Sequence, residues 1–229
     1  MTLPPEAFEA LWLTLWVAVL ATALGLPVAL ALAFALVRRF PGRFVLNLLV
    51  HLPLVLPPVA TGWLLLIWFG RKGPVGGALE TLFGLVLAFS WKGAVLAAMV
   101  MAMPLMVRPI RQSIEALPRE VLISAASLGA TRAQVLARVV WPMIRPGVLV
   151  GAMMGFAKAL GEFGATITFV AAIPGQTRTL ASAIQGQLSV PGGEAAAAGM
   201  VGLSVLLAMG ALAGAEILGV RAARRVAGR

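Results

Sequence analysis

The chain has 229 residues, of which 61% are hydrophobic and only 11% are charged. Soluble domains carry about 45–50% apolar and about 25% charged residues, so this composition excludes an ordinary soluble enzyme, and it also excludes a disordered protein. The net charge of +10 comes from basic residues in short segments between apolar runs, which favours contact with membrane lipids over nucleic acid.

Long apolar runs predict an all-α integral membrane protein with about five transmembrane helices in a single domain. Runs such as residues 11–37 lack the alternation of a membrane β-barrel, and helices satisfy every backbone group in lipid. No basic segment precedes the first run, so we expect a retained span rather than a cleaved signal. The expected spans are residues 10–37, 44–69, 91–110, 146–165 and 195–220.

Local signals predict further features between these spans. Pro53, Pro57 and Pro58 should break the second span midway, because proline lacks a backbone donor. Residues 79–89 are apolar but short, which indicates an interfacial helix, and Ser90 is expected to cap the helix that follows. Residues 177–188 are a candidate for a sixth short helix.

The charge distribution orients the spans. With the N-terminus outside, the inner segments hold 13 of the 18 basic residues and the outer segments hold 3. The positive-inside rule therefore predicts an outer N-terminus and a cytoplasmic C-terminus, where Arg221, Arg224 and Arg225 form a cytoplasmic anchor.

Residues 111–145 form the longest polar stretch, on the predicted inner side. Pro118 favours the start of one short helix, Gly129 ends it, and Thr131 can cap a second helix that ends at Pro142. Two short helices on a membrane face would form a docking surface for a cytoplasmic partner, and a plain connecting loop is the alternative.

The fourth span carries small residues on one face and an ionisable pair. Gly147, Gly151 and Gly155 recur at every fourth residue, which favours close helix packing, either in a homodimer or within the subunit, unless it reflects glycine richness alone. Lys158 and Glu162 lie about one helical turn apart. Ionisable groups in a span face the protein interior or a wet cavity, so this pair either lines a translocation path or fixes helix packing.

The segment after this pair has groups suited to weak anion contact. Thr166 and Thr168 could form an outward gate together with Phe163, or their hydroxyls could bond back to their own helix. We find no phosphate loop, no cysteine, no aspartate and a single histidine. These absences argue against a catalytic site, a metal site or a bound cofactor in this chain, and against a membrane enzyme or assembly factor.

Several motifs together resemble a known family. The inner segment resembles the EAA loop of ABC importer permeases, because Gly129 and Pro142 have the family spacing. The positions that correspond to the motif are Ser124, Ala125, Gly129, Val139, Trp141 and Pro142. The second span (HLPLVLPPV), the Leu-Gly-Glu-Phe-Gly motif at residues 160–164 and the Pro-Gly-Gly-Glu motif are similar to those of molybdate permeases in the same order. The resemblance runs from about residue 11 to the C-terminus.

This resemblance implies a type I ABC importer permease in the bacterial inner membrane that carries molybdate, and also tungstate. It implies a homodimer and two ATPase subunits, which dock on the loop and themselves bind ATP and magnesium. It also implies a periplasmic or extracellular oxyanion-binding protein. A sulfate or thiosulfate permease is the nearest alternative, because it shares the Gly-Glu-Phe-Gly motif. A stand-alone channel or ion-coupled carrier is the alternative from another class, and it usually shows an internal repeat, which we do not find here.

Overall fold

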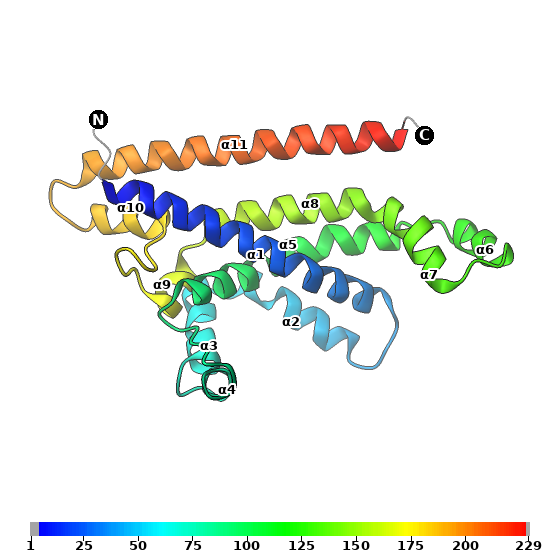
Figure 1. Ribbon diagram of the computed structural model, residues 1–229, viewed down its shortest axis with the longest axis horizontal. Coiled ribbons are helices and arrows are strands. Elements are labelled where there is room, and N and C mark those ends of the chain that lie inside the picture. The colour runs from blue at the N-terminus through cyan, green and yellow to red at the C-terminus, as the bar shows by residue number, and fades with distance from the viewer. Residues whose placement is uncertain (1–4, 228–229) are drawn as a thin grey trace.

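Residues 5–227 form an elongated bundle of helices, and no strand occurs among them (Figure 1). The computed structural model describes the backbone of these residues, while the side chains of residues 5, 126, 212 and 215–227 lie outside the described set, and with them the predicted anchor of Arg221, Arg224 and Arg225. In chain order the helices are α1 (Pro5–Val37), α2 (Arg43–Val55), α3 (Pro58–Phe69), α4 (Pro74–Phe83), α5 (Trp91–Glu115), α6 (Arg119–Ser127), α7 (Arg132–Val135), the π-helix η1 (Leu136–Val140), α8 (Trp141–Leu160), α9 (Gly164–Val170), α10 (Leu180–Leu188) and α11 (Glu194–Ala227).

Four helical runs of the described chain are long and apolar enough to cross a membrane: α1, α5, α11 and the run Arg132–Leu160. Of these, α5 is central, because 67% of its most apolar window is buried, against 33% for α1 and 11% for α11. It packs against both α1 and α8 through two apolar clusters, one around Met101 and Phe169 and one around Met106 and Ile110. The predicted multi-pass helical membrane fold is confirmed.

The predicted second span, residues 44–69, consists of two helices. Pro53 lies inside α2, and the break falls at Leu56, which is extended, and at Pro57, which has φ −53° and ψ 133° and is not helical. Proline pushes the residue before it toward extended conformations, so the consecutive prolines Pro57 and Pro58 separate the helices. The predicted break is confirmed, and Figure 1 shows α3 turned away from the direction of α2.

The predicted interfacial helix at residues 79–89 is wrong in its position. The helix in this region is α4, which begins earlier, at Pro74. It ends at Gly84, whose φ of +63° is a left-handed conformation that favours glycine. Residues 84–89 are not helical, and Ser90 caps α5 by accepting a hydrogen bond from the Gly93 amide, as predicted.

Short elements gather around the beginning of α1. The candidate helix within residues 177–188 is confirmed as α10, which Thr179 caps through the Ser182 amide. A small apolar cluster joins α1, α10 and α11 at this end, through Ala7, Ala10, Leu180, Ala183 and Met200. Helices α6 and α7 lie at the opposite end of the bundle (Figure 1).

Candidate functional site

The predicted inner segment forms two short helices, α6 and α7, joined by a tight turn. Gly129 sits in this turn with a φ of +79°, and Thr131 caps α7. The cap is reciprocal, because the Thr131 hydroxyl accepts from the Gln134 amide at 3.3 Å while the Gln134 side chain accepts from the Thr131 amide at 2.8 Å. The segment is therefore an ordered surface rather than a plain connecting loop.

Apolar side chains of this segment point into solvent. Leu128 is 88% exposed, Ile123 64% and Leu136 51%, and Trp141 adds part of its ring. Among the residues predicted for coupling, Ser124, Gly129 and Trp141 are exposed, whereas Ala125, Val139 and Pro142 are half-buried. Exposed apolar groups gathered in one segment are typical of interaction surfaces.

The second short helix does not end at Pro142, which corrects the prediction. The chain stays helical from Arg132 to Leu160, and the turn before Pro142 is the π-helix η1, in which the Trp141 amide bonds to the Leu136 carbonyl. Proline normally breaks a helix because it lacks a donor and crowds the carbonyl four residues earlier. The wider π turn explains how the helix continues past Pro142. One continuous helical run thus links the exposed segment to the far end of α8.

The glycine face of α8 is covered by α5 of the same chain. A Cβ atom at Gly151 would lie 2.8 Å from the Met106 carbonyl oxygen, and one at Gly155 would lie 2.6 Å from the Met106 side chain. At Gly147 the added carbon would overlap Ser113. The glycines of α8 therefore form a close helix contact within the subunit.

The predicted fourth span, residues 146–165, is not one helix. Helix α8 ends at Leu160, and α9 begins at Gly164. Glu162 lies in this break and is 3% exposed. It forms an ion pair with Lys158, and its other oxygen accepts the Ala165 amide at 3.0 Å. This one carboxylate therefore both pairs with a charge on α8 and satisfies the first turn of α9.

Helix α9 packs closely on α3. A Cβ atom at Gly62 would lie 2.5 Å from the Ala165 carbonyl oxygen, and one at Gly164 would lie 2.5 Å from Pro58. The Thr168 hydroxyl donates to the Gly164 carbonyl at 3.0 Å. This bond lies within α9, so the hydroxyl bonds back to its own helix, which was the alternative to anion contact.

Two buried threonines and a half-buried aromatic lie at or beside this seam. Thr166 is 3% exposed, and Phe163 is half-buried just before α9. Thr61 on α3 is 5% exposed, and within the described part of the chain its hydroxyl has no hydrogen-bond partner. The sequence analysis missed Thr61, although a hydroxyl in an otherwise apolar helix was a signal for it.

The loop between α9 and α10 is braced by one buried threonine. The Thr177 hydroxyl accepts the Ile173 amide at 3.0 Å and donates to the Ala171 carbonyl at 3.1 Å. Ala171 has φ 60° and ψ −173°, a combination that is essentially restricted to glycine. The loop is thus held in a strained conformation.

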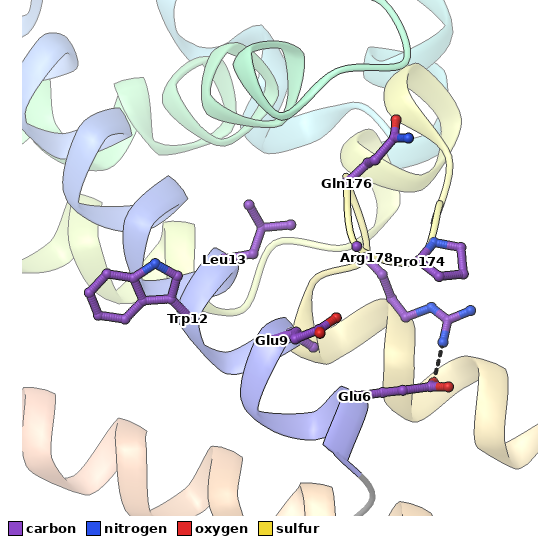
Figure 2. Close-up of a pocket in the computed structure, with 9 residues that line it drawn as sticks. Glu6, Glu9, Trp12, Leu13, Pro174, Gln176 and Arg178 are labelled. Carbon is purple, nitrogen blue, oxygen red and sulfur yellow. Dashed lines mark hydrogen bonds and ion pairs between the residues drawn. The ribbon is translucent and has the colours of Figure 1, made fainter.

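The same loop closes a pocket of about 300 Å³ against the start of α1. Figure 2 shows Arg178 paired with Glu6 across this pocket, with Glu9 and Trp12 also on its α1 side. Sequence reasoning did not find this pocket, because it joins residues more than 160 positions apart.

Comparisons with known proteins agree with this architecture. Residues 25–214 match a family described as "Binding-protein-dependent transport system inner membrane component". The chain is 49% identical over 185 residues to the Molybdenum transport system permease protein ModB of Escherichia coli (strain K12), covering 81% of this chain and 80% of that protein. It is 44% identical over 177 residues to the ModB protein of Haemophilus influenzae, covering 77% of each.

A solved structure supports the fold at low sequence identity. A chain of a bacterial ABC transporter involved in the import of the polysaccharide alginate superposes with a TM-score of 0.76 at 17% identity. The match covers 95% of this chain and 80% of that one. The predicted ABC importer permease fold is confirmed.

Proposed function

This chain belongs to the family of binding-protein-dependent transport system inner membrane components, and on that premise we propose that it is the membrane-spanning subunit of an ATP-driven importer that carries molybdate into the cytoplasm. The observation that carries the proposal is the 49% identity to a molybdenum transport permease over 81% of this chain. Tungstate, a similar tetrahedral dianion, is the second candidate cargo. ATP hydrolysis takes place on a separate ATPase subunit.

The ATPase subunit docks on the exposed surface of α6 and α7. Leu128 and Ile123 provide apolar anchors there, and burying them against a partner gains about 25 cal/mol for each Å² of apolar area. The run Arg132–Leu160 spans about 43 Å at 1.5 Å per residue. A displacement of the docking surface is therefore transmitted along this continuous helix to the non-helical residues between α8 and α9, which include Glu162.

Glu162 and its neighbours border the translocation path. A carboxylate would repel a dianion, but Lys158 and the Ala165 amide already offset its charge. Hydroxyls and backbone amides bind an anion weakly, and weak binding suits release to the cytoplasm. In this arrangement the path passes the seam of α3 and α9, where Thr61 and Thr166 lie.

The assembly is a homodimer in the bacterial inner membrane. The N-terminus and the loop braced by Thr177 face the periplasm, where a soluble binding protein delivers the anion, and α6 and α7 face the cytoplasm. The basic residues gathered at the α6–α7 side support this orientation.

Uptake of labelled molybdate in cells with and without this gene tests the cargo, with sulfate as competitor. We expect deletion to abolish high-affinity uptake, and excess sulfate not to compete. Equal competition by sulfate would point to a sulfate permease instead. Normal uptake in a strain without another molybdate importer would refute the proposal.

Co-purification tests the assembly independently of the cargo. The solubilised chain should bring an ATPase subunit with it under conditions that preserve complexes. A chain that purifies alone and still transports after reconstitution would support a stand-alone carrier instead.

A further inference from the structure

The turn between α1 and α2 combines basic and aromatic side chains on an exposed surface. Arg38 and Arg39 follow the last turn of α1 and are exposed. Phe40 is 39% exposed beside them, and Phe44 at the start of α2 is 73% exposed. Arginines at the end of a membrane helix are typical of the boundary between hydrocarbon and headgroups, because their long side chains reach the polar layer.

Within the described part of the chain, no carboxylate pairs with the two arginines of this turn. Glu115 on α5 is the nearby carboxylate, and it is already engaged by Arg111 at 2.8 Å and by Arg43 at 3.9 Å. Arg111 is further fixed by the Asn47 side chain at 3.0 Å. Among the described side chains, neither Arg38 nor Arg39 has a carboxylate within 4.0 Å.

The helices on either side of this turn, α1 and α2, indicate that it lies at the lipid boundary. α2 presents Leu48, Leu49 and Val55 to the outside, with exposures of 51%, 59% and 82%. Its 13 residues reach about 20 Å, which is less than the hydrocarbon thickness of about 30 Å. Helix α1 is long and apolar enough to cross a membrane and ends at Val37, so Arg38 and Arg39 lie just beyond its end, where arginine side chains reach the headgroups.

We propose that Arg38 and Arg39 form a binding site for the phosphate of an anionic phospholipid. Guanidinium groups pair with phosphate through two parallel hydrogen bonds, and the exposed face of α2 gives the acyl chains an apolar surface. Charge complementarity favours an anionic lipid over a zwitterionic one. The docking surface for the ATPase lies on α6 and α7, so the lipid does not compete with that partner. The site does not depend on the identity of the transported anion.

Native mass spectrometry of the full-length chain in detergent tests the site. The chain is titrated with dioleoyl phosphatidylglycerol and, separately, with dioleoyl phosphatidylcholine, and the ratio of the two affinities is measured. Each arginine near an anionic headgroup contributes about fivefold. We therefore expect Arg38→Gln/Arg39→Gln to lower the ratio at least about tenfold. Arg38→Lys/Arg39→Lys keeps the charges but not the two parallel hydrogen bonds, so it should lower the ratio less than the glutamine variant does.

The matched control removes the same charge elsewhere. Arg71 and Lys72 lie in the turn between α3 and α4, where Glu80 is already 3.8 Å from Arg71. Arg71→Gln/Lys72→Gln should lower the lipid ratio clearly less than Arg38→Gln/Arg39→Gln does, because Glu80 already offsets one of its two charges. An unchanged ratio in Arg38→Gln/Arg39→Gln would overturn the proposal. So would loss of the co-purified ATPase at an unchanged ratio, because the turn would then be a protein contact.

Discussion

Replacing Gly151 with alanine is expected to destabilise the protein, whereas most glycine-to-alanine changes in an exposed helix stabilise it. The added carbon would lie 2.8 Å from the Met106 carbonyl oxygen and 3.2 Å from Ile110. The obstructing oxygen belongs to the backbone of α5, so it cannot rotate away. Separating the two helices to make room would disrupt the contacts of the central helix.

The size of this effect follows from two opposing terms. Overpacking in a close-packed seam costs about 1–3 kcal/mol, and alanine regains about 1 kcal/mol of helix preference over glycine. Gly202 on α11 is the matched control, because nothing lies within 4 Å of an added Cβ there. Gly202→Ala keeps the full gain in helix preference without the overpacking cost, so the free energies of unfolding of the two variants should differ by about 1–3 kcal/mol.

Thermal unfolding of the purified chain in detergent measures this difference. A chain of this size shifts its Tm by about 2–4 °C for each kcal/mol, so Gly151→Ala should melt about 2–12 °C below Gly202→Ala. Gly155→Ala should fall between them, because it meets the flexible Met106 side chain. Equal melting temperatures for Gly151→Ala and Gly202→Ala would refute the close approach of α5 and α8.

Four further changes test the remaining sites. Glu162→Ala should lower stability by about 1 kcal/mol more than Glu162→Gln, since only glutamine keeps an acceptor for the first turn of α9, while both should slow uptake. Ala171→Gly should raise stability by about 1–3 kcal/mol by relieving its strained backbone. Leu128→Ser should abolish ATPase co-purification at unchanged stability, because this side chain is 88% exposed. Thr61→Val should stabilise the chain by about 1 kcal/mol by removing a buried hydroxyl without a partner, and slow uptake if the hydroxyl meets the anion.

Each of these predictions has an outcome that would contradict it. Normal uptake in Glu162→Gln would make the ion pair purely structural. Leu188 is the control for Leu128, being 58% exposed at the other end of the bundle. If Leu188→Ser releases the ATPase equally, the docking surface is misplaced. A lower melting temperature in Thr61→Val would mean that the hydroxyl has a partner, and no gain in Ala171→Gly would mean that the backbone there is unstrained.

The sequence predicted best those features that depend on neighbouring residues. Ser90 and Thr131 cap the helices that follow them, because a cap needs only a side-chain oxygen within three residues of an amide. The break at Pro57 follows from the same kind of local chemistry. Residues 79–89 are apolar, but Gly84 interrupts them and ends α4, so hydrophobicity alone predicts the wrong bounds for this helix.

Features that depend on tertiary contact could not be read in the same way. The glycine face of α8 left a dimer and an internal seam equally open, since only the position of Met106 on α5 decides between them. Thr61 became a candidate only when its burial was known. The end of α8 was missed because Glu162 interrupts an apolar stretch without a proline, and glutamate is not among the favoured capping residues.

The continuous helix from Arg132 to Leu160 has a consequence for coupling. A break at Pro142 would absorb movement of the docking surface in the turn before α8, whereas the observed chain stays helical through η1 into α8. The glycine face of α8 packs closely against α5, so the two helices should move together. Flexibility is then left to Gly129 on one side and to the break around Glu162 on the other. We therefore expect motion of α6 to reach the seam of α3 and α9 as a shift of α5 and α8 together, with Glu162 as the joint.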